Sequence, residues 1–387
     1  MRSDSRRFAI LGGGIGGLVL AIALEQKGFG VRLFESAPQW KPLGAGLGLA
    51  GNAVRAFMEL GISDAILDVS RIMKRVTIKN RQGRALSQTD SERLSTKFGV
   101  VNNFSIHRAD LHKVLLDHIT EGTAELNKAC TDIEQLPDGV VLHFADGTTH
   151  RADYLLACDG IHSLARKKLL PQSTTRFAGY TCWRAVIDNP PPNINWDETS
   201  ETWGGGARFG IVPLTHNRVY WFACLNASRG EEKFRNYKVP DLLRHFGDFH
   251  FPVPELLLRT REDQLIWNDI LDIAPLRKFA FNRVLLMGDA AHATTPNLGQ
   301  GACMAIEDAV MLANLLESAE SVEKAFETFE RRRLPYTKKI VNDSWRLGRV
   351  AQLENPVLMA LRNAAIRLTP ERVVENQFKF IFQVPLH

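Results

Sequence analysis

Three glycines near the start of the chain have the spacing of a phosphate-binding turn. Gly12, Gly14 and Gly17 follow the apolar run 8–11, and a segment rich in Ala and Leu comes directly after them. In such a turn the first glycine permits a sharp bend and the second lets a phosphate approach the backbone, while the third lets the helix pack against the strand. The N–H groups that begin the helix then favour an anion without any basic side chain.

An acidic residue completes this unit. A second apolar run, 31–34, ends in Glu35, which stands about 20 residues beyond the glycines, where a carboxylate can accept hydrogen bonds from ribose hydroxyls. The pattern predicts a Rossmann-type dinucleotide site, with a purely structural turn as the alternative. It does not distinguish NAD from FAD. The expected contacts are Gly12, Gly14, Ile15, Gly16, Gly17, Glu35 and Ser36.

Two later segments resemble motifs that distinguish the cofactor. Segment 159–166 reads D-G-I-H-S-L-A-R after an apolar run, and it resembles the motif D-G-x-x-S-x-x-R. Segment 288–302 reads G-D-A-A-H-A-T-T-P-N-L-G-Q-G-A after another apolar run, and it resembles a GD motif followed by a flavin-ring loop. With the N-terminal unit, these motifs resemble the class A flavin monooxygenases, the para-hydroxybenzoate hydroxylase family, across nearly the whole chain.

The resemblance implies a fold and a pair of cofactors. The expected fold is of the α/β class (mixed α+β), with a Rossmann-like FAD-binding domain, an interleaved mixed β-sheet substrate domain and C-terminal helices. FAD would be the resident cofactor. NAD(P)H would bind transiently, since no second dinucleotide fingerprint follows the first. Segments 179–183 and 208–214 look closest to the branch that holds zeaxanthin epoxidase, salicylate hydroxylases and urate hydroxylase.

Further FAD contacts follow from the matching positions. The resemblance implies that Asp289 contacts ribitol or ribose hydroxyls and that Arg108 holds phosphate or nearby polar groups. The alternatives are a helix N-cap for Asp289 and a solvated arginine at a helix start for Arg108. Many relatives place an arginine shortly before the segment 43–47, where this chain has Lys41. The implied contacts are Gly46, Leu47, Arg108, Asp159, Gly160, Arg166, Gly288, Asp289, Pro296, Gly299, Gln300, Gly301 and Ala302.

Oxygen transfer of this type needs no protein nucleophile. The resemblance implies that reduced flavin reacts with O2 to form a C4a-hydroperoxide, whose distal oxygen is electrophilic. The protein must exclude water and position an aromatic or other hydrophobic ring substrate. Our catalytic candidates are Arg208, which resembles a position facing substrate, Tyr220 on an alternating strand, and Pro296, whose loop can polarise the reacting oxygen. The alternatives are a surface arginine and a core tyrosine.

Other functions and sites compete with this hypothesis. The same fold could serve a flavin-dependent reductase or dehydrogenase, or a non-catalytic FAD-binding protein, against which the intact loop 299–301 argues. A halogenase is disfavoured because the chain has no Trp-x-Trp-x-Ile-Pro run. We expect His292 to form a structural hydrogen bond rather than to act as an acid or base. The remaining histidines show no ligand pattern, so no metal site is predicted.

Composition narrows the remaining classes. At 387 residues, with 45% hydrophobic and 24% charged residues, the chain is typical of a globular protein of about two domains. The net charge is only +5, and we interpret the run 331–333 as the solvated face of a helix, so no nucleic-acid partner is expected. Five cysteines without a C-x-x-C pair favour the cytoplasm. We expect a monomer or homodimer, with no export signal and no stable membrane insertion.

The motifs also predict an interleaved organisation. Residues 1–172 would form the first part of the FAD-binding domain, 173–272 the substrate-binding β-sheet domain, and 273–387 the second part together with C-terminal helices. Helical patterns at 322–333 and 343–353 are expected to pack on the FAD-binding domain, and the apolar segment 356–385 is expected to form packing helices.

Overall fold

The structure is a computed structural model that describes residues 4–40, 45–99, 103–382 and 386. Lys41, singled out in the sequence, lies outside these residues. One half of the molecule is built on a six-stranded sheet in the order β18-β19-β12-β1-β2-β8, in which only β18 and β19 are antiparallel. Its strands are β1 (Asp4–Leu11), β2 (Phe29–Phe34), β8 (Ala124–Glu125), β12 (Tyr154–Ala157), β18 (Ala280–Phe281) and β19 (Val284–Leu286).

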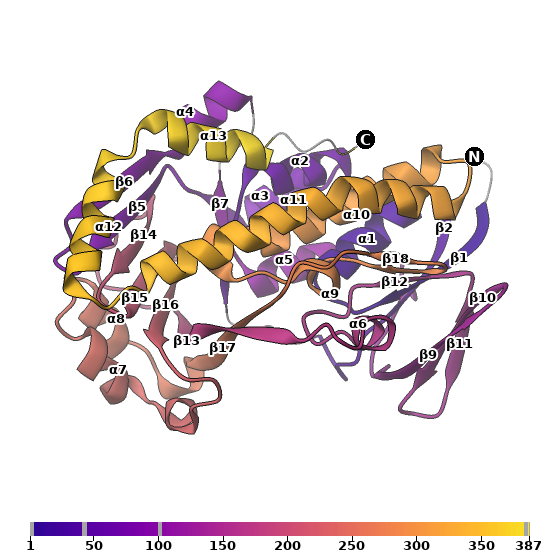
Figure 1. Ribbon diagram of the computed structural model, residues 1–387, viewed down its shortest axis with the longest axis horizontal. Coiled ribbons are helices and arrows are strands. Elements are labelled where there is room, and N and C mark those ends of the chain that lie inside the picture. Colours follow the sequence, from indigo (N-terminus) through magenta and orange to yellow (C-terminus); the bar gives the residue numbers. More distant parts are fainter. Residues whose placement is uncertain (1–3, 41–44, 100–102, 383–385, 387) are drawn as a thin grey trace.

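Both faces of this sheet are covered, which explains why its strands are continuous apolar runs. Helices α1 (Ile15–Gln26) and α10 (Gly301–Ser318) pack against each other on one side. A three-stranded antiparallel sheet of β9 (Cys130–Leu136), β10 (Gly139–Phe144) and β11 (Thr149–Ala152) lies on the other (Figure 1). The three predicted motifs all follow strands of the six-stranded sheet, so their turns meet at one edge of it.

A seven-stranded sheet forms the other half (Figure 1), in the order β17-β13-β16-β15-β14-β5-β6. Only β14 and β5 are parallel, so the sheet is mixed and the predicted α/β class is confirmed. Two of its strands come from within 1–172, and the predicted domain ranges stay a prediction. The strands are β5 (Arg75–Asn80), β6 (Ala85–Asp90), β13 (Thr175–Ile187), β14 (Glu198–Trp203), β15 (Ala207–Pro213), β16 (Val219–Asn226) and β17 (Ile266–Ile273).

The two faces of the seven-stranded sheet differ. One face carries Trp183, Phe209 and Trp221, which are buried beneath α7 (Val239–Phe246) and α8 (Val253–Leu258). The other, which we call the inner face, carries a separate small cluster around Tyr180 and Ile270. In the first part of β16, residues 219–223, the side chains alternate between buried and half-buried, as the pattern 218–223 predicts.

A single helix, α11 (Val322–Ala351), spans both halves of the molecule (Figure 1). The helical patterns predicted at 322–333 and 343–353 both lie in this one helix, apart from residues 352 and 353 at the end of the second pattern. Pro335 lies inside the 30-residue helix, which is about 45 Å long. Buried residues continue from Phe329 through Ile340 to Gly348, so packing along one face outweighs the hydrogen bond that the proline removes.

The remaining elements connect the two halves. In the described part of the chain, no helix is long and apolar enough to cross a membrane. Of the predicted helical segment 356–385, the described residues form two helices, Pro356–Leu368 and Glu371–Phe382, and the first of them exposes Val357, Leu361 and Leu368. The other elements are β3 (Gly46–Leu49), β4 (Ser70–Ile72), β7 (Phe104–His107), α2 (Gly51–Glu59), α3 (Ser63–Asp68), α4 (Ser91–Phe98), α5 (Arg108–Leu116), α6 (Leu164–Leu169), α9 (Asp289–His292), α12 (Pro356–Leu368), α13 (Glu371–Phe382) and three 3-10 turns, Glu232–Asn236, Glu262–Gln264 and Pro296–Leu298.

Candidate active site

The glycine turn between β1 and α1 is shaped by packing at two positions and open at one. Gly12 has a φ of 104°, and a Cβ there would lie 2.4 Å from the carbonyl oxygen of Cys158. A Cβ on Gly17 would lie 2.0 Å from the carbonyl oxygen of Gly12. At Gly14, the N-cap of α1, no atom of the described residues lies within 4 Å of a Cβ position. Of the three motif glycines, Gly14 is thus the one with open space beside it among the described residues, at the helix N-terminus where an anion is favoured.

Glu35 is held against the same turn. Its carboxylate accepts hydrogen bonds from the backbone N–H of Gly13 at 2.7 Å and of Ala37 at 2.8 Å. The side chain is only half-buried, so lone pairs remain accessible for ribose hydroxyls. Ser36 is exposed and donates to Glu35 at 3.1 Å. The geometry agrees with a carboxylate that reads a nucleotide sugar next to its phosphates.

The D-G-x-x-S-x-x-R segment ties two turns together. Ser163 caps α6, while the buried guanidinium of Arg166 donates to the carbonyl oxygens of Ala290 at 3.0 Å and of Ile161. Arg166 thus joins this turn to the GD turn, and no contact with FAD is needed to explain its burial. Asp159 accepts from the N–H of Ala165 at 3.2 Å, and its Oδ1 is buried without a hydrogen-bond partner in the described residues. Burial raises the pKa of Asp159, and a hydroxyl donor in the site would satisfy this oxygen.

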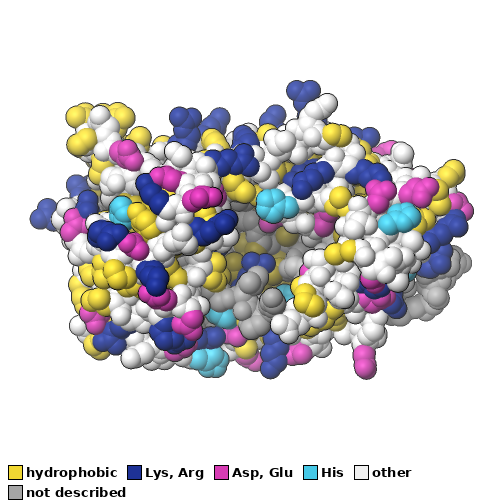
Figure 2. Space-filling view, turned by 90° about the horizontal axis from the view of Figure 1, so that it is seen from below, with side chains coloured by type: hydrophobic (Ala, Val, Ile, Leu, Met, Phe, Trp, Pro, Cys, Tyr) yellow, Lys and Arg dark blue, Asp and Glu magenta, His cyan; other side chains and the backbone are white. Residues whose placement is uncertain are grey.

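Asp289 lies where a cofactor hydroxyl could reach it. Gly288 is the N-cap of α9, so the alternative that Asp289 serves as the N-cap is wrong. The carboxylate is accessible, yet the surrounding protein desolvates it enough to raise its pKa, against the pull of His292, Arg108 and Arg166. This combination is expected of a group that lines a deep hollow. Figure 2 shows the molecule hollowed near its centre, with hydrophobic and basic side chains inside.

Arg108 begins α5 and is half-buried. Burial lowers its pKa, the Asp289 carboxylate acts in the opposite direction, and Arg184 of the seven-stranded sheet lowers it further. Arg108 therefore lies between the FAD-side residues and the sheet. An arginine at this position can neutralise the anionic cofactor, and the alternative of a fully solvated helix-start residue does not match its burial.

The flavin-ring loop prepares a helix N-terminus. Pro296–Leu298 forms a 3-10 turn, Gly299 follows with a φ of 63°, and Gln300 is the N-cap of α10. Gln300 is buried and accepts a hydrogen bond from Asn52 at 3.1 Å. The first N–H groups of α10, from Gly301 and Ala302, are therefore free of helical partners. They can stabilise negative charge on a ring edge placed before them.

A buried ionic network supports this loop from behind. Arg333 is fully buried and donates to Asp308 Oδ1 at 2.6 Å and to Glu307 Oε2 at 3.2 Å. Asp308 Oδ2 pairs with His292 Nε2 at 2.6 Å and accepts from the N–H of Gly288 at 3.1 Å. The expected structural hydrogen bond of His292 is confirmed. The prediction that the run 331–333 is solvated is wrong for Arg333, because its side chain points into the protein to neutralise two carboxylates.

The inner face of the seven-stranded sheet approaches both flavin turns. A Cβ on Gly46 would lie 2.6 Å from the ring of Tyr220, so that ring lies directly against the glycine of β3. Tyr180 donates from its hydroxyl to Asn297 Oδ1 at 3.0 Å, next to Pro296. Leu47, next to Gly46, is half-buried. The space between the two tyrosines is consequently bounded by the sheet on one side and the flavin turns on the other; we call it the chamber.

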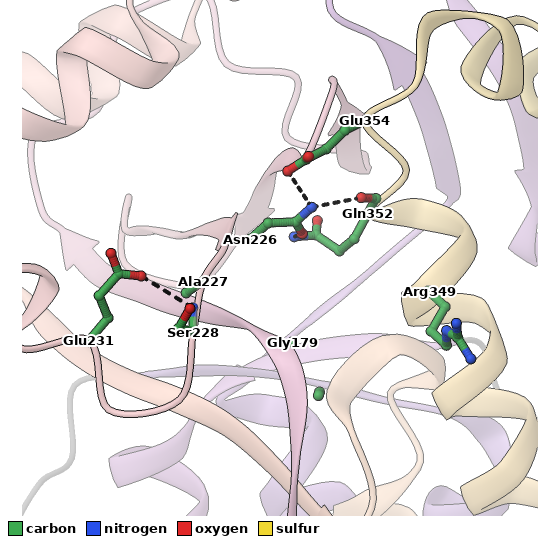
Figure 3. A pocket seen from close by; sticks show the side chains of 9 residues that line it. Gly179, Asn226, Ala227, Ser228, Glu231, Arg349, Gln352 and Glu354 are labelled. Atoms are coloured by element: carbon green, nitrogen blue, oxygen red, sulfur yellow. Dashed lines mark hydrogen bonds between the residues drawn. The ribbon is translucent and has the colours of Figure 1, made fainter.

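Arg208 lies on the inner face but is not exposed on the sheet surface, so that alternative is wrong. It is 3% exposed and donates to Glu201 Oε1 at 2.9 Å and Gln352 Oε1 at 2.8 Å. Its guanidinium lies 5.0 Å from the ring centre of Tyr180. Figure 3 shows Gln352 and Asn226 beside an open pocket of about 510 Å³. Arg208 therefore links the chamber wall to the end of α11.

Comparison with known proteins agrees with this site. Residues 7–344 match the family model described as an FAD binding domain. The chain is 35% identical over 359 residues to an aurachin C monooxygenase/isomerase of Stigmatella aurantiaca, covering 93% of each chain. It is 32% identical over 370 residues to a 2-heptyl-3-hydroxy-4(1H)-quinolone synthase of Pseudomonas aeruginosa, covering 93% of this chain and 94% of that protein.

A solved structure of a similar protein agrees with the same family. The Klebsiella pneumoniae protein HpxO, complexed with FAD and uric acid, has a TM-score of 0.92 to this chain at 27% identity, covering 100% of this chain and 99% of that one. The chain belongs to the class A FAD-dependent monooxygenases. This monooxygenase therefore uses FAD, with NAD(P)H as the usual reductant of the family, and the predicted enzyme class and cofactors are confirmed.

Sequence reasoning missed two arginines of the monooxygenase. The run 331–333 predicts a solvated face, because the packing that brings Asp308 and Glu307 against Arg333 is not visible in the sequence. Arg184 lies on the inner face two residues after Cys182, donates to Asn268 Oδ1 at 3.2 Å, and has a buried Nε without a partner in the described residues. The odd-even pattern of β13 could have placed Arg184 on the same face as Tyr180. No group of three or more potential metal ligands occurs in the part of the chain described.

Proposed function

We propose that this FAD-dependent monooxygenase inserts one oxygen atom from O2 into a hydrophobic heteroaromatic ring held in the chamber. The observation that carries the proposal is the pair of contacts made by the inner face, Tyr220 against Gly46 and Tyr180 with Asn297. These contacts place the inner face of the sheet beside the flavin turns. A substrate held between them would therefore be bordered by both.

The character of the chamber supports an apolar ring rather than a highly polar one. Phe222 and Tyr220 are half-buried neighbours on the inner face, with ring centres 6.1 Å apart. Rings of this kind favour flat, apolar ligands. Two relatives at more than 30% identity are named for aurachin C and for a heptyl-substituted quinolone. We infer a quinolone-like substrate, a fused nitrogen ring with an apolar substituent.

Arg184 gives the chamber a polar anchor. Its buried Nε can donate to a ring oxygen, and its charge would stabilise that oxygen as the ring becomes more electron-rich. Burial opposes its charge, but the negative charge of the Cys182 thiolate beside it holds its pKa above the usual value, so Arg184 stays protonated. We infer that a ring hydroxyl or carbonyl oxygen points towards Arg184 while the reacting carbon faces the loop at Pro296.

The chain's own groups then bind, orient and exclude water. When bound, FAD supplies hydride acceptance from NAD(P)H and activation of O2. The turns at Gly14, Glu35 and Asp159 would hold its phosphates and sugar hydroxyls, and the N-terminus of α10 would stabilise negative charge on the ring. The buried side chains of the sheet keep water from the reacting atoms. Arg208, Tyr220 and Pro296 are proposed to position the substrate and the reacting oxygen.

The proposal also covers the location, oligomeric state and partners of the enzyme. All five cysteines are unpaired in the structure, which suits a reducing cytoplasm. We propose a cytoplasmic monomer or homodimer that acts on a small molecule and not on nucleic acid.

A ligand screen tests the function. The holoenzyme is mixed with NADH or NADPH and a library of ring compounds, among them 4-quinolones, and NAD(P)H oxidation and O2 uptake are recorded. We expect a quinolone to stimulate both and to gain the mass of one oxygen atom, with the label retained when 18O2 is supplied. Substrate turnover that proceeds without O2 would instead establish the reductase or dehydrogenase. Flavin binding without turnover of any ring compound would favour the non-catalytic alternative.

A further inference from the structure

Two thiols lie side by side on neighbouring strands of the inner face. Cys182 of β13 and Cys224 of β16 are directly opposed in an antiparallel pair. They belong with Tyr180 to the cluster on the inner face, and Arg208 of β15 is the next residue in the same row, opposite Cys224. Directly opposed residues in such a pair have Cα atoms about 4.5–5.5 Å apart. A disulfide requires about 4.4–6.8 Å, so the register already permits one.

The two thiols are chemically unequal. Their side chains hydrogen-bond to each other, which lowers the pKa of Cys182 to about 7 and raises that of Cys224. Burial acts against ionisation of Cys182, while Arg184 and Arg208 facing it from β13 and β15 favour the thiolate. The hydroxyl of Tyr220, also on the inner face, stays protonated because burial raises its pKa. Cys182 is therefore the more acidic of the two thiols and Cys224 stays protonated, and both side chains are buried, at 5% and 2% exposed.

The other cysteines lack these conditions. Burial raises the pKa of Cys130 to about 11 and of Cys303 to about 12, and it raises that of Cys158 further. None of the three is opposed to another cysteine in the described strands. A thiolate at neutral pH is the form that attacks peroxide. Reaction with an oxidant should therefore be selective for the pair in the chamber.

We propose that Cys182 and Cys224 form a peroxide-responsive thiol pair that closes to a disulfide and switches off substrate oxidation. The Cys182 thiolate attacks one oxygen of H2O2, which breaks the O–O bond, gives a sulfenic acid and releases hydroxide. The Cys224 thiol then attacks the Cys182 sulfur, forms the S–S bond and releases water. Two thiols are oxidised, one H2O2 is reduced to two waters, and a small-molecule thiol restores the pair.

The position of the two cysteines beside the chamber indicates what the disulfide would do for the enzyme. Reduced flavin that meets O2 without a ring substrate yields H2O2, and under the proposed function that peroxide would be released into the chamber. Closing the disulfide brings the two sulfur atoms to about 2.0 Å apart, which shifts side chains in the row that holds Arg208. A displacement of about 1 Å in a substrate-positioning group can cost about 100-fold in rate. The pair would thus stop wasteful reductant use when substrate is scarce.

The test supplies peroxide directly, so it does not depend on the source. Holoenzyme is treated with a small excess of H2O2 and analysed by intact mass and by peptide mapping without reduction. We expect the loss of two hydrogens per chain, one linked peptide pair containing Cys182 and Cys224, and full reversal by dithiothreitol. Bound FAD should stay constant while substrate-stimulated NAD(P)H oxidation falls by about tenfold or more, and recovers on reduction.

Matched variants separate the pair from general oxidation. Cys130→Ser removes a half-buried thiol outside the chamber and should behave like the wild type. Cys224→Ser keeps a hydroxyl donor beside Cys182 but cannot form a disulfide, so it should leave a sulfenic acid on Cys182 that dimedone traps. Cys182→Ala should leave Cys224 unmodified. Alkylation of both Cys182 and Cys224 after peroxide treatment, or over-oxidation of Cys182 without a link to Cys224, would overturn the inference. A reversible disulfide in a protein that oxygenates no ring would overturn the proposed function and leave the peroxide-responsive thiol pair itself standing.

Discussion

Replacing Arg333 by methionine removes the only cation that contacts both Asp308 and Glu307 in the described part of the chain. Arg333 lies 2.6 Å from Asp308 Oδ1 and 3.2 Å from Glu307 Oε2, and all three side chains are fully buried. Removing one partner of a buried ion pair costs about 3–5 kcal/mol, because the remaining charge stays in a poorly solvating site. Total stability is typically about 5–15 kcal/mol, so the change is large.

The measurement is thermal and urea unfolding of wild type, Arg333→Met and a control, followed by flavin release and tryptophan fluorescence. We expect Arg333→Met to lose about 3–5 kcal/mol and to release FAD before it unfolds, since Asp308 also holds the N–H of Gly288. Arg331→Met alters an exposed residue of the same helix and should change stability by less than about 0.5 kcal/mol. Equal losses in the two variants would refute the buried network as the support of the flavin loop.

The pH dependence of the stability difference between wild type and Arg333→Met gives an independent check of the buried network. Burial tends to raise the pKa of Asp308, but Arg333 and His292 outweigh it and hold that pKa below the usual value. Its stabilising contribution is therefore present above the unfolded pKa and is lost as the pH falls through the folded one. In Arg333→Met the carboxyl pKa should instead be raised, and protonation then relieves the destabilisation. The stability gap should narrow from about pH 7 to about pH 4; a constant gap would contradict the assignment.

Three further predictions concern the site itself. Gly14→Val should abolish FAD binding while the apoprotein keeps its melting temperature, because no atom of the described residues lies within 4 Å of the new Cβ. Gly17→Ala should destabilise the apoprotein, because its Cβ would lie 2.0 Å from the carbonyl oxygen of Gly12. Equal losses of melting temperature in the two variants would contradict this. Arg208→Gln should retain FAD by absorbance yet weaken substrate-stimulated NADH or NADPH oxidation, and undiminished stimulation would make Arg208 purely structural. The rate of alkylation of Cys182 by iodoacetamide should rise with pH and level off above about 7, which is the pKa of its thiol. A rate that still rises at pH 9, about the pKa of a free thiol, would contradict the lowered pKa of Cys182.

Much of the cofactor site could be predicted because its determinants are local. Gly12, Gly14 and Gly17 define a turn through their own backbone and near neighbours, and an acid after the next strand completes it. The turns at Asp159 and Asp289 likewise follow short apolar strands of one parallel sheet. Parallel strands place their carboxyl ends at the same edge, so local motifs were sufficient to predict that these turns meet.

The missed features depend on register and helix packing across long separations. Arg333 follows two exposed arginines, and only the packing of α11 on α10 shows that it faces Asp308. The opposition of Cys182 and Cys224 depends on strand register, which composition does not reveal. Helix α11 passes through Pro335 because packing along its whole length outweighs one local preference. Such features follow from tertiary contacts that no sequence window contains.

The account depends most on the claim that three separate turns hold one FAD beside the chamber. Titration of flavin-free protein with FAD, followed by quenching of flavin fluorescence, measures this directly. We predict saturation at one FAD per chain for the wild type and no saturable binding for Gly14→Val at the same protein concentration. Absence of saturable FAD binding by correctly folded wild-type protein would contradict the account.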